Sequence, residues 1–246
     1  MDVLDLITAI VQARMGSTRL PGKVLMDIVG KSMLERVVHR VRRCREVDSI
    51  VVATSDLPKD QVVVDECNKL NVPVYRGSEE DVLFRYYQAA KHYEAKLVVR
   101  FCSDSPLIDP EVSDQAIRTL KDNLDTLDVC SIIIEKTYPL GLHTEALTFE
   151  TLEKAQLMAQ KDFERSHVTP FIYENPQLFR IKNIACIPNY SHHRWTVDTQ
   201  EDLDFVRALY QRLKDSGKID DFSWKDVLEI LNKEPQLSDI NASIVP

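Results

Sequence analysis

The stretch Leu6-Ile-Thr-Ala-Ile-Val11, followed one residue later by Ala13-Arg-Met-Gly-Ser-Thr-Arg-Leu-Pro-Gly-Lys23, indicates the fold and the site of this chain. The first part is apolar and predicts a buried strand. The second part predicts a loop with three cations, two hydroxyls and two glycines: Arg14, Arg19, Lys23, Ser17, Thr18, Gly16 and Gly22. Glycines let backbone amides approach an anion, and Arg and Lys neutralise its charge. We therefore expect a phosphate-binding loop, the alternative being an ordinary solvated loop.

Composition narrows the class of protein. The formal net charge of -8 argues against nucleic-acid binding and against binding to anionic membranes, which need a basic face. The sequence shows no run of about 18 apolar residues and no h-region of a signal peptide, so we expect neither a membrane span nor a signal peptide. Five scattered cysteines without a CxxC pair argue against disulfides and a structural zinc site and favour the cytoplasm.

Strand and helix patterns alternate along the 246 residues. Strand patterns cover residues 6–11, 49–54, 72–75, 96–101, 128–134 and 179–186. Helix patterns cover residues 32–44, 59–70, 81–93, 111–120, 149–161, 164–174, 199–213 and 224–231. The pattern at 164–174 is interrupted by Pro170. This alternation predicts an α/β fold with a mostly parallel sheet between two layers of helices. We expect one domain over residues 1–235, with an acceptor or dimer segment at about 136–193, and a loose tail over 236–246.

The loop Ala13–Lys23 does not fit the two commonest phosphate motifs. Five residues, not four, separate Gly16 from Gly22, and Val24 stands where a Walker A motif has a magnesium-binding hydroxyl. A dinucleotide-binding GxGxxG turn is absent as well. The spacing therefore argues against P-loop ATPases and NAD-dependent enzymes.

Two aspartates follow later strands, at the edge of the sheet where α/β proteins bind ligands. Asp104 comes directly after the strand at 96–101, and Asp198 ends an extended run before a capping box that begins at Thr199. Magnesium in proteins is held by one or two carboxylates together with substrate phosphates. We therefore expect Asp104 and Asp198 to hold Mg²⁺, whereas Asp109 and Asp202 are expected to cap helices.

Three further segments carry candidate side chains. Arg76-Gly-Ser-Glu-Glu-Asp-Val82 predicts either nucleotide contacts from Arg76, Ser78 and Asp81 or an ordinary helix start capped by Ser78. Gly141-Leu-His-Thr-Glu145 and Arg165-Ser-His-Val-Thr169 lie in the least regular part of the sequence. They offer four candidates for acceptor binding or for an interface: His143, Glu145, Arg165 and His167.

These motifs together resemble the SpsF-like cytidylyltransferase family, which is homologous to the CMP-KDO and CMP-sialate synthetases. The resemblance runs from Ile7 to about Leu213, and Gln12–Lys23 and Arg76–Arg85 are similar to two signatures of the family. It implies a nucleotide-diphospho-sugar transferase fold (GT-A, Rossmann-like), three-layered with a mixed sheet, and usually a homodimer. It also implies that CTP is bound by Ala13, Arg14, Gly16, Ser17, Thr18, Arg19 and Lys23.

The sequence departs from the family at three positions. Ser103 stands where the family usually has Gly, His143 where it has Asp, and Ser166 where it has an acidic residue. The half of the site that resembles a CTP site is intact, whereas the half expected to bind the acceptor is altered.

The resemblance implies transfer of CMP from CTP to a sugar-like acceptor, with release of pyrophosphate, for cell-surface glycans. Arg14, Arg19 and Lys23 would hold the phosphates, and Asp104 and Asp198 would hold Mg²⁺. His143 or His167 could act as base for a hydroxyl acceptor, whereas a phosphate or phosphonate acceptor needs none. A glycosyltransferase and an inactive nucleotide-binding homologue are the alternatives.

Overall fold

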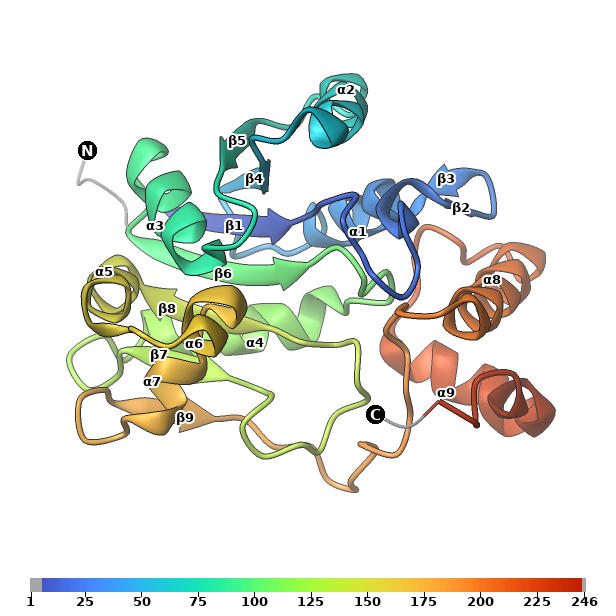
Figure 1. The fold of residues 1–246 in the computed structure, drawn as a ribbon. Coiled ribbons are helices and arrows are strands. Elements are labelled where there is room, and N and C mark those ends of the chain that lie inside the picture. The colour runs from blue at the N-terminus through green and yellow to red at the C-terminus, as the bar shows by residue number, and fades with distance from the viewer. Residues whose placement is uncertain (1–5, 245–246) are drawn as a thin grey trace.

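A seven-stranded sheet runs through the part of the chain that the computed structural model describes, residues 6–244 (Figure 1). The outer ends of the expected domain and tail, residues 1–5 and 245–246, lie outside the described residues. In spatial order the strands are β5 (Val74–Gly77), β4 (Ser49–Ser55), β1 (Ile7–Gln12), β6 (Leu97–Cys102), β8 (Glu145–Thr148), β7 (Val129–Ser131) and β9 (Ile181–Asn183). Within this sheet β8 runs opposite to the other six strands, so the predicted mixed, mostly parallel sheet is confirmed.

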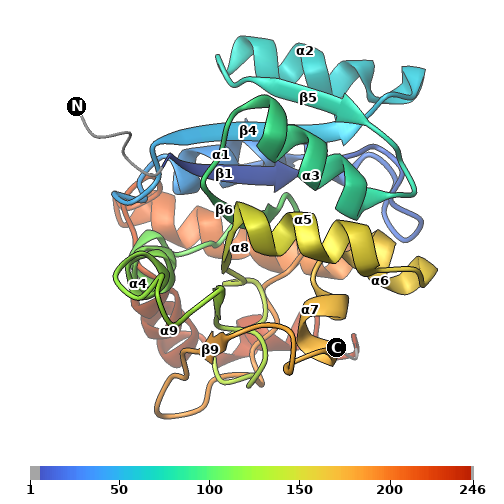
Figure 2. The same cartoon turned by 90° about the vertical axis from the view of Figure 1, so that its left-hand side faces the viewer.

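Helices cover both faces of the sheet. The α-helices are α1 (Met33–Val41), α2 (Gln61–Lys69), α3 (Val82–His92), α4 (Pro110–Lys121), α5 (Phe149–Met158), α6 (Asp162–His167), α7 (Pro170–Glu174), α8 (Gln200–Asp215) and α9 (Trp224–Lys233). Alternate residues of β1 enter different cores: Ala9 and Val11 pack with α1, α4 and α8, and Ile10 packs with α3 and α5. Figure 2 shows α3, α5 and α6 in front of the strands and α8 behind them. These layers confirm the α/β architecture.

Three predicted helix starts are confirmed by their caps. The Ser32 hydroxyl accepts a hydrogen bond from the amide of Glu35 at the start of α1. Asp109 caps α4 by accepting from two backbone amides. Thr199 and Asp202 form the capping box of α8, so their short polar side chains satisfy amides that have no partner within the helix.

The later part of the sheet differs from the prediction. The strands expected at 128–134 and 179–186 shrink to β7 and β9, and the sequence analysis missed β8. The helix expected at 164–174, with an interruption at Pro170, is divided into α6 and α7, and α7 begins at Pro170. The break itself lies at Val168, whose φ of 76° no α-helix accommodates. A hairpin of β2 (Asp27–Ile28) and β3 (Lys31–Ser32), which was not expected either, lies between the N-terminal loop and α1.

The end of the described chain is packed, where we expected a loose tail. Pro235–Asp239 form a 3-10 turn with Leu237 buried. The side-chain amide of Asn241 donates to Asp202 at 2.9 Å and to the carbonyl of Arg194 at 3.2 Å. Residues 235–244 therefore support the segment that leads into α8. Within residues 6–244, no helix has both the length and the apolar character that a membrane crossing requires.

Candidate active site

The carboxyl ends of β1 and β6 and the segment before α8 meet around a cavity of about 450 Å³. Ten of the predicted site residues line it: Ala13, Arg14, Gly16, Ser17, Thr18, Arg19, Lys23, Asp104, His167 and Asp198. The two aspartates and the cationic loop are thus brought together, although up to 185 positions separate them in the sequence (198 minus 13).

Lys23 is the centre of this arrangement. It lies in a single 3-10 turn (Lys23–Leu25), and its side chain is only 10% exposed. Its ammonium lies 3.3 Å from Asp104 Oδ2 and 3.0 Å from Asp198 Oδ1, and it donates to the carbonyl of Val197 at 2.7 Å. The amide of Val197 donates to the carbonyl of Asp104 at 2.8 Å, which fixes the irregular segment before α8 to the segment that follows β6. One buried cation therefore sets the spacing of the two carboxylates.

Asp198 has the denser set of partners. Arg19 Nη2 lies 3.0 Å from Oδ1, and Arg194 Nη2 lies 2.8 Å from Oδ2. Arg194 is itself held by the buried Asp202. Burial alone would raise the pKa of Asp198, but Lys23, Arg19 and Arg194 hold it below its ordinary value. Asp198 is therefore ionised at neutral pH.

The backbone of the cationic loop is held by a buried carboxylate. Asp60, in the 3-10 turn Pro58–Asp60 after β4, accepts from the amide of Met15 at 2.7 Å. The carbonyl of Met15 accepts in turn from the amide of Gly22 at 3.1 Å, which closes the loop. Gly22 has a φ of 73°, a conformation that glycine adopts without a steric penalty. The loop is therefore fixed in shape before any anion binds.

The pair Asp104 and Asp198 fits a hard divalent cation. Their oxygens are the ligands that Mg²⁺ prefers, and both lie within 3.3 Å of one point, the Lys23 ammonium. Among residues 6–244 no group of three or more metal-binding side chains is found. The donor set is thus one that phosphates and water would complete, the usual way in which proteins hold magnesium.

Other predicted residues lie elsewhere. Six of them are not among the described residues that line the cavity: Arg76, Ser78, Asp81, His143, Glu145 and Arg165. The Arg76 guanidinium donates to Gln61 and to the carbonyls of Ser55 and Leu57, so it braces the end of β4. Asp81, and not Ser78, is the N-cap of α3.

Arg165 joins two helices and does not reach the cavity. It donates to Asp81 Oδ2 at 2.6 and 2.9 Å and to two carbonyls at the end of α5. This ion pair fixes α6 to the first turn of α3. Arg165 and Asp81 therefore position α6 relative to α3 beside the site.

Glu145 lies under the cavity wall and is 1% exposed. It pairs with Arg100 and accepts a hydrogen bond from the Tyr173 hydroxyl at 2.5 Å. Burial alone would raise the pKa of Glu145, but Arg100 and the hydroxyls of Tyr173 and Thr169 hold it below its ordinary value. Glu145 therefore holds Arg100, which does line the cavity, and has no free oxygen for a substrate.

His167 stands on a strained turn at the cavity wall. The amide of Thr169 donates to the carbonyl of His167 at 3.0 Å, across the buried Val168 with φ 76° and ψ -57°. A three-residue turn of this hand is rare and strained, and strain of this kind concentrates at functional sites. Burial, together with Arg100 and Arg14, lowers the pKa of His167, so its ring is neutral at pH 7. Burial lowers the pKa of His143 as well.

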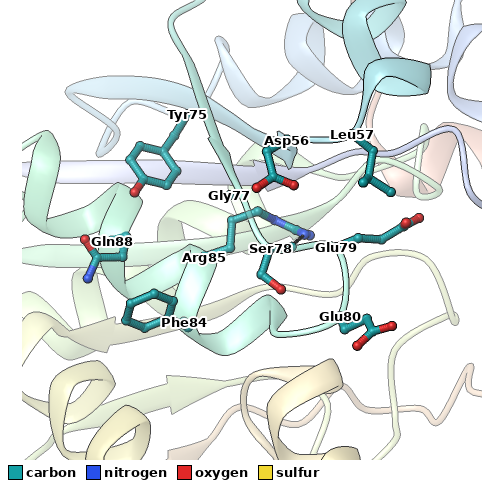
Figure 3. A pocket seen from close by; sticks show the side chains of 10 residues that line it. All are labelled: Asp56, Leu57, Tyr75, Gly77, Ser78, Glu79, Glu80, Phe84, Arg85 and Gln88. Atoms are coloured by element: carbon teal, nitrogen blue, oxygen red, sulfur yellow. Dashed lines mark hydrogen bonds between the residues drawn. The ribbon is translucent and has the colours of Figure 1, made fainter.

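The sequence analysis missed two cationic side chains that line the cavity, those of Arg85 and Arg100. The sequence contains a signal for each of them. Arg85 is the last residue of the second family signature, and Arg100 is a cation within an otherwise apolar strand. Arg85 also lines a second cavity of about 530 Å³ between β5 and α3, shown in Figure 3. It is buried and donates to the carbonyl of Ser78, so it forms a wall between the two cavities.

Comparison with known proteins gives consistent results. A family model described as cytidylyltransferase matches residues 8–225. The spore coat polysaccharide biosynthesis protein SpsF of Bacillus subtilis is 34% identical over 236 residues, which cover 93% of this chain and 95% of that protein.

Two solved structures have the same fold. A cytidylyltransferase from Leptospira borgpetersenii superposes with a TM-score of 0.90 at 29% identity, covering 94% of this chain and 96% of that one. A CMP:2-keto-3-deoxy-manno-octonic acid synthetase complexed with CTP superposes with a TM-score of 0.66 at 20% identity, covering 84% of this chain and 98% of that one.

Proposed function

Since this chain belongs to the cytidylyltransferase family and is therefore a nucleotidyltransferase that uses CTP, we propose that it transfers CMP to a sugar acid or a related sugar-like acceptor and releases pyrophosphate. The observation that carries this proposal is Lys23 between Asp104 and Asp198, next to a loop with two more cations. The family relationship to SpsF supports a place in polysaccharide biosynthesis.

The cationic loop binds the leaving group in this proposal. Arg14, Arg19 and Lys23 all line the cavity, where they would meet the β- and γ-phosphates of CTP. As an acceptor oxygen forms its bond to the α-phosphorus, the bond from that phosphorus to the β-phosphate oxygen breaks, and negative charge collects on pyrophosphate. Positioned cations stabilise this charge, and such reactions depend mainly on positioning and electrostatics.

Asp104 and Asp198 would hold Mg²⁺, which when bound neutralises charge on the triphosphate and the α-phosphoryl group. Lys23, which now neutralises both carboxylates, is then free to pair with a phosphate. Arg194 and Asp202 keep Asp198 in place throughout.

His167 is the base that the geometry favours for a hydroxyl acceptor, because it lines the cavity whereas His143 does not line it within the described residues. Its lowered pKa leaves a ring nitrogen free to take the hydroxyl proton at pH 7. An acceptor that attacks through a phosphate or phosphonate oxygen needs no such step.

The proposal also includes the domain organisation, the oligomeric state and the location of the protein. We propose one catalytic domain over residues 1–235 with an acceptor or dimer segment at about 136–193, a homodimer, and a cytoplasmic location. Exposed apolar side chains of Leu157, Met158 and Phe163 on α5 and α6 support an interface in that segment.

The test is a pyrophosphate-release screen with each nucleoside triphosphate against 3-deoxy-2-keto sugars, sugar phosphates and polyol phosphates. The proposal expects release with CTP and only in the presence of an acceptor. Equal release with all four nucleotides would count against a cytidylyltransferase. A protein that instead consumes a preformed nucleotide sugar would be a glycosyltransferase.

A further inference from the structure

A carboxylate lies against the phosphate loop. Glu79 Oε1 is 2.6 Å from Lys59 Nζ and 3.9 Å from Arg14 Nη1, and the same Arg14 nitrogen donates to the Glu79 carbonyl at 3.1 Å. A Cβ placed on Gly16 would meet Glu79 Oε1 at 2.4 Å and Lys59 Nζ at 2.9 Å. The side chains of Glu79 and Lys59 therefore contact the loop at Gly16, where the absence of a Cβ allows their close approach.

Both partners are fixed to the loop by their neighbours. Lys59 directly precedes Asp60, which accepts from the amide of Met15, so one short turn holds the loop backbone and presents an ammonium beside it. Glu79 lies in the connection from β5 to α3. Figure 3 shows the side chains of Glu79 and Glu80 both directed away from Arg85, with Glu80 lower in the view.

We propose that Glu79 is an internal anion of the phosphate loop and that Lys59 is a further cation of the triphosphate site. In the absence of nucleotide, Glu79 pairs with Lys59 and Arg14. When a triphosphate or pyrophosphate binds, its outer phosphate displaces the Glu79 carboxylate and takes both cations. This inference rests on the proposed function for the identity of the triphosphate.

The exposure of the pair suits such an exchange. The Lys59 side chain is 46% exposed, and the Glu79 side chain is 20% exposed. Ion pairs in this setting are weak, so a phosphate with more charge and more acceptor oxygens competes well for the same cations. Lys59 needs only a rotation of its flexible stem to follow, because its ammonium already lies beside Gly16, which lines the cavity.

The experiment is calorimetric titration of inorganic pyrophosphate, and separately of CTP, without acceptor. Glu79→Gln removes the competing charge and should tighten pyrophosphate binding about fivefold, the factor that corresponds to the upper range for exposed ion pairs. The matched control is Glu80→Gln, which removes the neighbouring carboxylate and should leave the affinity unchanged. Unchanged or weaker binding by Glu79→Gln would overturn the proposal.

Lys59→Met tests the other partner. If Lys59 moves to the phosphate, this variant binds pyrophosphate more weakly, and it also cancels the gain of Glu79→Gln in the double variant. If Lys59 only neutralises Glu79, Lys59→Met frees the carboxylate for Arg14 alone and leaves the double variant as tight as Glu79→Gln, which contradicts the proposal.

Pyrophosphate binding separates this inference from the proposed function. If Glu79→Gln binds pyrophosphate no more tightly than wild type while wild type still transfers CMP, this inference is refuted and the proposed function stands. If Glu79→Gln binds pyrophosphate more tightly but wild type transfers no CMP, the proposed function is refuted and this inference stands.

Discussion

Replacement of Glu145 by Gln should strongly destabilise the protein. The change keeps the shape of the side chain but removes the charge that faces Arg100, and it can place an amide N–H against the guanidinium. Arg100 is 11% exposed, and its Nε already has no partner within the described structure. Removal of one partner of a buried ion pair costs about 3–5 kcal/mol, a large part of the roughly 5–15 kcal/mol that stabilises a typical domain.

Urea unfolding followed by circular dichroism measures this loss. With a slope of about 3 kcal/mol per molar urea, typical of larger domains, the midpoint should fall by about 1 M or more. The double variant Glu145→Leu with Arg100→Met should recover part of the loss, because an apolar pair leaves no buried charge. A midpoint for Glu145→Gln within about 0.3 M of wild type would refute the account of this network.

The pH dependence of stability is a second measurement on the same network of Glu145 and Arg100. The pKa of Glu145 in the folded protein lies below its unfolded value of about 4.5. Its ionised form therefore stabilises the fold above pH 4.5, and this contribution is lost as the pH falls through the lower folded pKa. In Glu145→Gln this part of the acid destabilisation should be missing.

Three further predictions concern the site and its support. Lys23→Ala and Asp104→Ala should each lower kcat by about 10²–10³ while the circular dichroism spectrum stays that of wild type; near-wild-type rates would contradict the site. Gly141→Ala should lower the thermal midpoint more than Gly217→Ala. Both glycines have positive φ, but a Cβ at position 141 would meet a backbone atom at 2.9 Å, whereas a Cβ at position 217 would meet no atom within 4 Å. Equal losses in the two variants would refute the steric argument. Burial lowers the pKa of His193 to about 4, so wild type should lose stability as the pH falls from 6.5 to 4, and His193→Asn should lose less over that window; identical pH profiles would count against it.

The first half of the fold could be predicted because local signals agree with tertiary structure there. The strand at 6–11 and the caps Ser32 and Asp109 follow from apolar runs and short polar side chains. The rule that ligands bind at the carboxyl ends of parallel strands places Asp104, after β6, in the site. Asp198 also lines the cavity, but it was expected after a strand and lies in an irregular segment before α8.

The second half could not be predicted because its structure depends on partners distant in the sequence. Strand β8 has four residues, and its antiparallel pairing with β6 and β7 decides its conformation. Pro170 indicates where α7 begins, but the sequence does not indicate the positive φ of Val168, because valine is a residue type that favours strands.

Side-chain direction was the other missing information. Arg76 and Arg85 belong to one signature, yet Arg76 braces the end of β4 and Arg85 faces the cavity. Glu145 was predicted as a candidate for acceptor binding or for an interface, because it lies in the irregular segment Gly141–Glu145. Its burial against Arg100, which only the fold shows, makes it a positioning residue.

The most direct test of the central claim is the stoichiometry of one reaction: CTP with the best acceptor of the screen, with pyrophosphate measured enzymatically and the acceptor product weighed by mass spectrometry. The account predicts one pyrophosphate for each acceptor that gains a CMP group, and product formation about 10²–10³-fold slower with Lys23→Ala. Pyrophosphate without a CMP-bearing product, or a product formed equally well by Lys23→Ala, would contradict it.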